Sequence, residues 1–187
     1  MTHAADQQDQ PAPAARARRP RAVLVGLPGT GKSSVGTRLA GRLSVPFADS
    51  DRLVSQLAGR SVAQIFAADG EAEFRRLEAV VVLEALAGFD GVLALGGGAV
   101  TTERVRTGLA RSGVPVVLLT AAVPELLSRL GRSPNPRPLL AGDPAGRLAT
   151  LAAERDELYR RLCTITVDTG GRSIGAVAEL ILRELPR

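Results

Sequence analysis

The stretch GLPGTGKSS, residues 26–34, restricts the possible folds of this chain more than any other feature. It matches the phosphate-loop pattern GxxxxGK[ST] and separates a valine-rich run, residues 21–27, from apolar residues at helical spacing, residues 32–43. Glycines in such a loop let successive backbone N–H groups turn toward phosphate oxygens, and the following helix adds its positive N-terminus. The stretch therefore predicts a strand–loop–helix unit that binds a phosphate.

Short apolar runs alternate with helical patterns along the rest of the chain. This alternation is typical of the α/β class, in which helices cover both faces of a parallel sheet. We predict three layers around five parallel strands, within residues 21–27, 45–51, 91–100, 114–120 and 164–169. Helices are predicted within residues 32–43, 52–59, 61–70, 70–88, 101–113, 123–131, 147–162 and 173–185.

Ligands of parallel α/β sheets bind beyond the carboxyl ends of the strands. Three groups of residues follow predicted strands directly: the glycine loop, the acids Asp49 and Asp51, and the glycines Gly96–Gly98. We therefore expect these groups to lie together. Gly96, Gly97 and Gly98 could form a plain turn, or their missing side chains could let the backbone approach a ligand closely.

Composition limits the function classes. Of 187 residues 45% are hydrophobic, which suits one domain over residues 21–187, and residues 1–20 are expected to be a disordered tail. There is no apolar run of 18 residues, so no membrane span is expected. The net charge of +5 comes without a basic stripe interleaved with aromatics, so we expect no nucleic-acid partner. The single cysteine, Cys163, favours a cytoplasmic location.

The only histidine, His3, lies in the predicted tail. A folded body without histidine excludes histidine-based catalytic triads and histidine-ligated zinc there. Any proton transfer must then use Asp, Glu, Arg, Lys or Tyr.

The phosphate loop carries Lys32, the only lysine of the chain. Its compact ammonium can lie between the β- and γ-phosphates of ATP, whereas a planar guanidinium fits such a cradle badly. The Ser33 hydroxyl is a candidate ligand of Mg²⁺. The remaining loop residues expected to contact the nucleotide are Gly29, Thr30, Gly31 and Ser34. The competing interpretation is a strand–helix turn that is merely rich in glycine.

Mg²⁺ also needs a carboxylate nearby. The third predicted strand carries no acid, so Asp49 at the end of the second strand is the best candidate. Asp51 would point to the same side if that strand continued. Capping of the next helix is an equally reasonable additional role for Asp51.

Several arginines are candidates for binding an anionic acceptor. Arg75 has Glu78 three positions later on a helix to orient it, and Arg155 lies in ERDELY. For both, an ordinary solvated ion pair is the more common outcome. Arg137 lies in a Pro/Gly-rich segment, about 131–146, which is either a linker or a lid that closes over the site.

The motifs together resemble those of shikimate kinases, over roughly residues 21–187. They follow in the family's order and spacing: GLPGTGKSSVGTRLAGRL, FADSD, IFAADGEAEFRRLE, LALGGGAV, RPLL and ERDELY. The phosphate loop alone is generic, whereas the joint occurrence of the other motifs is highly specific. The resemblance implies a phosphate-loop kinase fold like that of nucleoside-monophosphate kinases, a monomer, and transfer of the γ-phosphate of ATP to the 3-hydroxyl of shikimate.

The same resemblance implies roles for individual residues. Ser33 and Asp49 serve Mg²⁺, and Asp51 holds hydroxyls of shikimate and assists their deprotonation. Arg75 and Arg155 bind the shikimate carboxylate. The remaining roles fall to the lid arginine Arg137, which reaches the transferred phosphate, to Arg129, which stacks on adenine, and to backbone N–H groups of Gly96, Gly97 and Gly98.

Three alternatives remain. A gluconate kinase usually has a His-Pro pair after its acidic motif, and the body has no histidine. A nucleoside-monophosphate kinase lacks the GGGA turn paired with FRxxE. A non-catalytic nucleotide-binding module is disfavoured because Lys32, Ser33, Asp49 and Arg137 are all present.

Overall fold

The computed structural model describes residues 18–132 and 143–186. In this part of the chain five parallel strands form one sheet in the order β2-β3-β1-β4-β5. The strands are β1 (Ala22–Val25), β2 (Phe47–Asp49), β3 (Val92–Ala94), β4 (Val116–Thr120) and β5 (Ile165–Asp168). The helices are α1 (Lys32–Leu43), α2 (Ser50–Ala58), α3 (Val62–Gly88), the 3-10 helix η1 (Ala99–Thr101), α4 (Glu103–Ser112), α5 (Val123–Gly131), α6 (Pro144–Leu162) and α7 (Ile174–Glu184).

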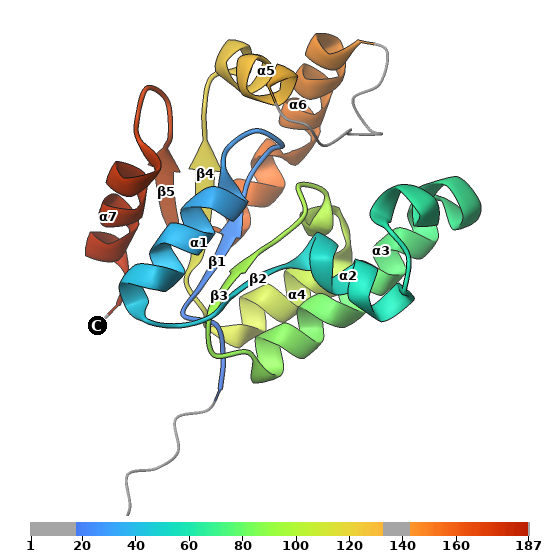
Figure 1. Cartoon of the computed structure of the whole chain (residues 1–187), viewed down its shortest axis with the longest axis horizontal. Coiled ribbons are helices and arrows are strands. Elements are labelled where there is room, and N and C mark those ends of the chain that lie inside the picture. The colour runs from blue at the N-terminus through green and yellow to red at the C-terminus, as the bar shows by residue number, and fades with distance from the viewer. Residues whose placement is uncertain (1–17, 133–142, 187) are drawn as a thin grey trace, which may run out of the picture.

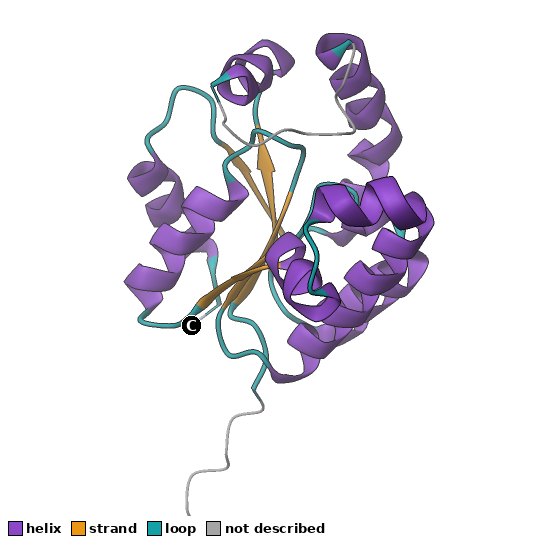
Figure 2. Ribbon diagram, turned by 45° about the vertical axis from the view of Figure 1, so that its right-hand side comes forward, coloured by secondary structure: helices purple, strands orange, loops and turns teal. Residues whose placement is uncertain are grey.

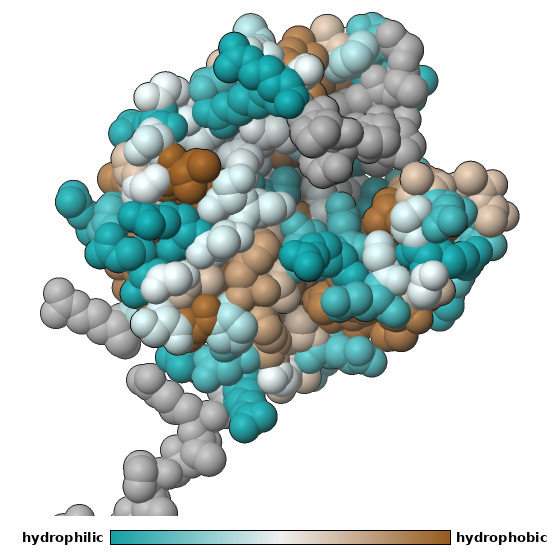
Figure 3. Space-filling view, in the orientation of Figure 1, coloured by the Kyte–Doolittle hydropathy of each residue, from teal (hydrophilic) through white to brown (hydrophobic). Residues whose placement is uncertain are grey.

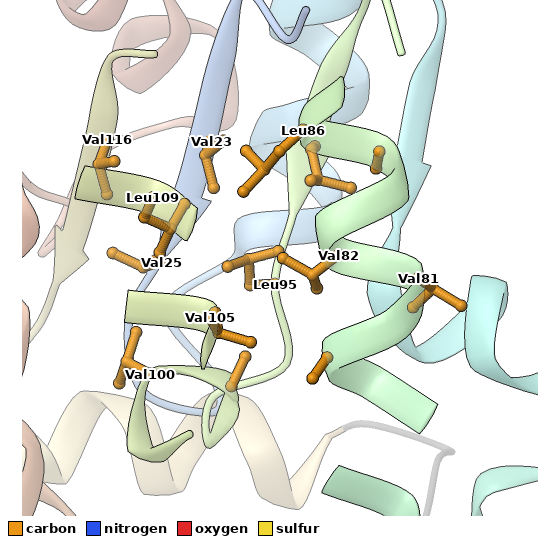
Figure 4. Close-up of a cluster of buried hydrophobic side chains, with 14 of the residues drawn as sticks. Val23, Val25, Val81, Val82, Leu86, Leu95, Val100, Val105, Leu109 and Val116 are labelled. Atoms are coloured by element: carbon orange, nitrogen blue, oxygen red, sulfur yellow. The ribbon is translucent and has the colours of Figure 1, made fainter. Parts of the chain in front are cut away.

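The sheet is the middle of three layers, as the sequence predicts (Figure 2). Side chains alternate along each strand, so β1 supplies Val23 and Val25 to one face, and Ala22 and Leu24 to the other. Helices α3 and α4 cover the first face, where Val82 of α3 packs in the same cluster as the β1 valines (Figure 4). Helices α1 and α7 cover the second face. Burial on both faces explains why the three central strands, β3, β1 and β4, are almost wholly apolar, whereas the edge strands β2 and β5 are only partly buried.

The carboxyl ends of the strands lie at the top of Figure 1, where α5 and α6 also stand. The phosphate loop follows β1, Asp49 ends β2 and the three glycines follow β3, all at this carboxyl end of the strands. The described N-terminal residues enter at the opposite end, where β1 begins. The fold therefore gathers the predicted ligand-binding residues at one end of the sheet.

Local signals set most helix ends. Ser61 and Gln64 form a reciprocal capping box at the start of α3, and Gly59 and Gly113 end α2 and α4 in the left-handed conformation. The prediction of two helices on either side of Gly70 is confirmed: both lie within α3, and they meet at a kink where Gly70 has a non-helical backbone (φ 80°, ψ 178°). The glycine therefore ends one helix and changes the direction of the chain before the next.

Three boundaries differ from the predictions. The second strand ends at Asp49 and helix α2 begins at Ser50, so Asp51 lies in a helix rather than in a continued strand. The predicted lid, 131–146, overlaps helix ends, because α5 includes Gly131 and α6 begins at Pro144. In the predicted tail, Pro20 is buried, Arg18 and Arg19 are exposed, and residues 1–17 lie outside the described part.

Apolar side chains are largely buried. In the described part, the large hydrophobic residues that are exposed are Leu57 and Ile174. In Figure 3 the hydrophobic areas on the visible face are scattered among hydrophilic residues. No helix of the described residues has the length and apolar character needed to cross a bilayer.

Candidate active site

The phosphate loop has the backbone expected of an anion cradle. Gly26, Gly29 and Gly31 have φ of 143°, 87° and 88°, values that L side chains rarely adopt. Gly31 is also the N-cap of α1, and no side chain caps that end of the helix. The first N–H groups of α1 are therefore available to an anion.

Two side chains brace the loop from within. Lys32 Nζ donates to the carbonyl oxygens of Gly26 and Leu27 at 2.8 and 3.0 Å, so its ammonium is drawn back over the loop. Thr30 is buried and donates to Leu27 O at 2.8 Å. Ser33 and Ser34 are exposed in the first turn of α1. The loop thus presents one cation, two hydroxyls and backbone N–H groups.

The two predicted metal ligands lie side by side. Ser33 Oγ donates to Asp49 Oδ2 at 2.7 Å, although the residues belong to different strand–helix units. In the described residues no three His, Cys, Asp or Glu side chains cluster as a metal site. Two hard oxygen ligands beside a phosphate cradle nonetheless fit Mg²⁺, because it keeps several of its waters and takes further ligands from phosphates.

Helix capping at this edge falls to Asp49. Its Oδ1 accepts from the backbone N–H of Asp51 at 3.0 Å, so Asp49 is the N-cap of α2. The capping role considered for Asp51 is therefore wrong. Asp51 lies in the first turn of α2, where its side chain turns toward the Gly96–Gly98 turn.

Arg75 is held within the protein rather than solvated. Its side chain is 13% exposed, its Nη1 donates to Glu78 Oε2 at 2.6 Å, and its Nε and Nη2 donate to Glu71 at 3.2 and 3.0 Å. It also lies 5.2 Å from the centre of the Phe74 ring. Arg76 pairs with Glu73 at the surface, as expected for a residue that points elsewhere. Ordinary solvation describes Arg76 but not Arg75.

Glu78 and Arg155 carry the clearest sign of a ligand. Glu78 is 0% exposed and Arg155 is 4% exposed. Among the described residues, the buried side-chain polar atoms without a hydrogen-bond partner are Glu78 Oε1 and Arg155 Nε. Buried polar groups normally have a partner, so a water or ligand is expected at these atoms.

Burial raises the pKa of Glu78 to about 7. The positive charges of Arg75 and Arg155 lower this pKa, and the nearby Asp51 carboxylate raises it. Desolvation outweighs the ion pair with Arg75 because the carboxylate has lost contact with water. Glu78 thus sits between two arginines and a second acid.

The Gly96–Gly98 turn is narrow because the protein's own side chains fill the space beside it. A Cβ at Gly96 would lie 2.5 Å from Glu78 Oε1 and 2.7 Å from Asp51 Oδ1, and one at Gly98 would lie on the Arg75 guanidinium. A Cβ at Gly97 would lie 3.1 Å from Pro28 of the phosphate loop. Because these glycines have no side chains, Arg75, the acids Asp51 and Glu78, and the phosphate loop can all pack against the turn.

Sequence reasoning missed two residues that hold this turn. Ser50 is fully buried and its Oγ accepts from the Gly96 N–H at 2.8 Å, so that N–H is already used within the protein. The Tyr159 hydroxyl donates to Gly97 O at 2.6 Å. The sequence gives no local signal for either contact, because the partners are 46 and 62 positions apart.

Arg129 lies on the other side of the phosphate loop. It donates to Thr169 Oγ1 at 2.9 Å, to Thr169 O at 2.8 Å, and to Gly29 O at 3.4 Å. Glu125, one turn earlier on α5, fixes it at 2.5 Å. These contacts place Arg129 between the phosphate loop and the loop after β5. Arg137 lies outside the described residues.

The shikimate kinase family model matches residues 28–186 of the chain. The chain belongs to the shikimate kinase family. It is 54% identical over 167 residues to the shikimate kinase of Mycobacterium marinum, covering 89% of each chain. It is 53% identical over 168 residues to that of Mycobacterium avium, covering 89% of this chain and 94% of the relative.

Solved structures of the family share the fold. Shikimate kinase from Acinetobacter baumannii in complex with shikimate superposes with a TM-score of 0.83 at 36% identity, covering 89% of this chain and 92% of that chain. The Aquifex aeolicus shikimate kinase gives a TM-score of 0.74 at 31% identity, over 88% and 95% of the two chains. A gluconokinase from Sinorhizobium meliloti, at 20% identity and a TM-score of 0.61, is alike in fold alone.

Family membership confirms the predicted phosphate-loop kinase fold and makes the chain a small-molecule kinase of the shikimate pathway, with ATP as phosphate donor. The competing interpretations as a gluconate kinase, a nucleoside-monophosphate kinase or a non-catalytic module are wrong.

Proposed function

We propose that the chain transfers the γ-phosphate of ATP to the 3-hydroxyl of shikimate, with the chemistry divided between two halves of the site. The observation that carries this proposal is the pair of unpartnered buried atoms, Glu78 Oε1 and Arg155 Nε, in a cluster that packs against the phosphate loop. Such a cluster suits a small acceptor with one carboxylate and several hydroxyls.

The nucleotide half consists of the phosphate loop and its neighbours. Backbone N–H groups at the start of α1 bind the phosphates, and Lys32 exchanges its loop carbonyls for β- and γ-phosphate oxygens. Ser33 and Asp49 hold Mg²⁺, which when bound neutralises charge on the β- and γ-phosphates. Arg129 stacks on adenine, and Arg137, outside the described residues, completes the charge around the transferred group.

The acceptor half orients shikimate. Arg75 and Arg155 bind its carboxylate, because a guanidinium offers a planar fork of donors that matches a carboxylate. Asp51 accepts hydrogen bonds from the hydroxyls and takes the proton of the 3-hydroxyl as the new O–P bond forms. The bond between the γ-phosphorus and the bridging oxygen of the β-phosphate breaks in the same step, and ADP leaves. Backbone N–H groups of Gly97 and Gly98 complete the contacts. In phosphoryl transfer, positioning and charge neutralisation dominate, so a strong base is not required.

A coupled ADP-release assay tests the proposal. Shikimate, gluconate, AMP and no acceptor are compared at equal concentration, with and without Mg²⁺, and the position of the product phosphate is read by NMR. We expect turnover with shikimate and Mg²⁺, and phosphate on the 3-hydroxyl. A folded enzyme that turns over gluconate or AMP but not shikimate would overturn the proposal.

We further propose that the enzyme acts as a cytoplasmic monomer without a nucleic-acid or membrane partner. The small exposed apolar area and the absence of a basic stripe support this. Sedimentation equilibrium should give a mass near 19.5 kDa, with or without shikimate. A mass twice this value at assay concentrations would contradict it.

A further inference from the structure

One carbonyl of the glycine turn receives two donors from the same helix. Gly97 O accepts from Tyr159 Oη at 2.6 Å and from Arg155 Nη1 at 2.8 Å. Both donors lie on α6, four positions apart, and so on one face of that helix. Tyr159 is 4% exposed and has no polar atom besides its hydroxyl to bury. Helix α6 is therefore fastened to the turn by two bonds at one point.

These bonds fix more than the carbonyl. A peptide unit is planar and trans, so holding Gly97 O on the α6 side directs the N–H of Gly98 to the opposite side. Within the described residues, neither the Gly97 nor the Gly98 N–H donates a hydrogen bond, whereas the Gly96 N–H is taken by Ser50. Two N–H donors of the turn thus have no acceptor among residues 18–132 and 143–186, and the contacts from α6 set the orientation of the Gly98 N–H.

Arg155 is shared between two roles. Its Nη1 donates to Gly97 O, its Nε has no partner among the described residues, and under the proposed function the same guanidinium also binds the carboxylate of shikimate. Tyr159 has no such second role. A carbonyl oxygen has two lone pairs, so the phenol keeps its bond whether or not Arg155 shifts toward the substrate.

We propose that Tyr159 is a positioning residue for the acceptor: its hydroxyl holds the Gly97–Gly98 peptide in place while Arg155 engages the substrate. The inference rests on the proposed function, because it needs shikimate to be the acceptor. Burial raises the pKa of Tyr159 to about 12, which keeps the phenol protonated, and so a donor, at any pH at which the enzyme works.

Tyr159→Phe removes the hydroxyl and keeps the ring. We expect the KM for shikimate to rise about 3- to 10-fold, as for loss of one neutral hydrogen bond, with the KM for ATP unchanged. Thr164→Val is the matched control, because the Thr164 hydroxyl bonds Val116 at the opposite edge of the sheet. It should lower the melting temperature and leave both KM values unchanged.

A merely structural Tyr159 predicts a different result. An unchanged shikimate KM, or an equal rise of both KM values, would overturn the inference. Lack of wild-type turnover with shikimate would overturn the proposed function together with this inference. Turnover by the wild type with an unchanged KM in the variant would overturn the inference alone.

A second measurement needs no variant. Tyr159 is the only tyrosine of the chain, so 3-fluorotyrosine labelling gives a single protein ¹⁹F signal. We expect shikimate to shift this signal because its carboxylate binds the guanidinium of Arg155, which shares Gly97 O with the phenol, and gluconate at the same concentration to leave it unchanged. A signal that does not move at saturating shikimate would contradict the inference even if Tyr159→Phe fails to fold.

Discussion

The two halves of the site are built in different ways. The phosphate loop of the nucleotide half, residues 26–34, is contiguous in sequence, is formed largely by backbone, and reaches solvent at Ser33 and Ser34, whereas Asp49 and Arg129 come from β2 and α5. The acceptor half draws side chains from α2, α3, the turn after β3 and α6, and its central residues Glu78 and Arg155 are buried. One half is a local motif, and the other is a tertiary network.

The difference determines how each half responds to change. Substitutions other than proline leave the backbone N–H groups of the phosphate loop in place, so its chemistry depends on glycine conformation and on Lys32. In the acceptor half, Arg75 and Glu78 form an ion pair, and removing Arg75 leaves the Glu78 carboxyl buried without that partner. Substitutions should therefore affect catalysis in the first half, and both binding and stability in the second.

The largest effect is expected from Lys32→Arg. The charge is kept, but the planar guanidinium cannot occupy the space where Nζ lies 2.8 and 3.0 Å from two loop carbonyls. Loss of one donor aimed at the developing charge lowers kcat by about 10²–10³-fold. Steady-state kinetics and a thermal melt measure this.

Arg38→Lys is the control for Lys32→Arg, because Arg38 is exposed on the same helix. It should keep full activity. A Lys32→Arg enzyme with near wild-type kcat would mean that the loop requires only a positive charge.

Arg75→Ala should affect the acceptor half alone. Loss of a charged hydrogen-bond donor should weaken shikimate binding about 10- to 100-fold and leave ATP binding unchanged. It should also destabilise the fold, because Glu78 loses the partner at 2.6 Å. Calorimetry with each ligand separates the two effects.

Two further variants sharpen this test. Arg76→Ala removes the neighbouring arginine, whose side chain is 59% exposed, and should change neither affinity. The double variant Arg75→Ala with Glu78→Gln should regain stability without regaining shikimate affinity. Equal weakening of ATP and shikimate binding by Arg75→Ala would make the arginine structural.

More of the nucleotide half than of the acceptor half could be predicted from the sequence. Lys32, Ser33 and Asp49 could be placed because each follows a strand end, and strand ends meet at one edge of a parallel sheet. The contact of Arg75 with Glu78 could be predicted from helical spacing. The contact of Tyr159 with Gly97 could not be predicted, because the two residues are 62 positions apart. In the sequence of a helix, a tyrosine that makes such a contact cannot be told from an ordinary core residue.

The same limit explains the error at the acidic motif. Asp49 and Asp51 are both reasonable helix caps by residue type. Which of them caps depends on whether β2 ends before Ser50, and that is set by burial of Ser50 against the Gly96 N–H. A tertiary contact thus decided a question that local propensity left open.

The buried carboxyl of the acceptor half should give the protein a pH-dependent stability. Glu78 ionises near 4.5 in the unfolded chain and near 7 when folded, so between these values the folded state holds more protons. The free energy of unfolding should therefore fall as pH rises from about 4.5 to 7, by at most ~3 kcal/mol, and level off above.

Urea unfolding of the wild type and of Glu78→Gln across this pH range measures the effect. The difference between the two proteins removes the contribution of the other carboxylates. We expect the difference in unfolding free energy between the wild type and Glu78→Gln to change with pH. For the control Glu157→Gln, whose side chain is 73% exposed, the difference from the wild type should stay nearly constant with pH. A pH-independent difference would mean that the Arg75 charge keeps Glu78 ionised throughout.

The smallest effect is expected from truncation of the N-terminus, because it enters at the edge of the sheet opposite both halves of the site. Arg21 forms an ion pair with Asp90 at 2.6 Å, and its backbone N–H donates to Gly91 O at 2.8 Å. Arg21 is therefore expected to contribute to the stability of the folded domain. Arg19 adds an exposed contact to Ser112 O at 3.5 Å, which contributes little to stability.

Deletion of residues 1–17 should therefore leave kcat, both KM values and the melting temperature unchanged. Deletion of residues 1–21 should lower the melting temperature and still leave both KM values unchanged. A changed KM for either substrate after the shorter deletion would show that the tail reaches one half of the site, and the substrate affected would identify which half.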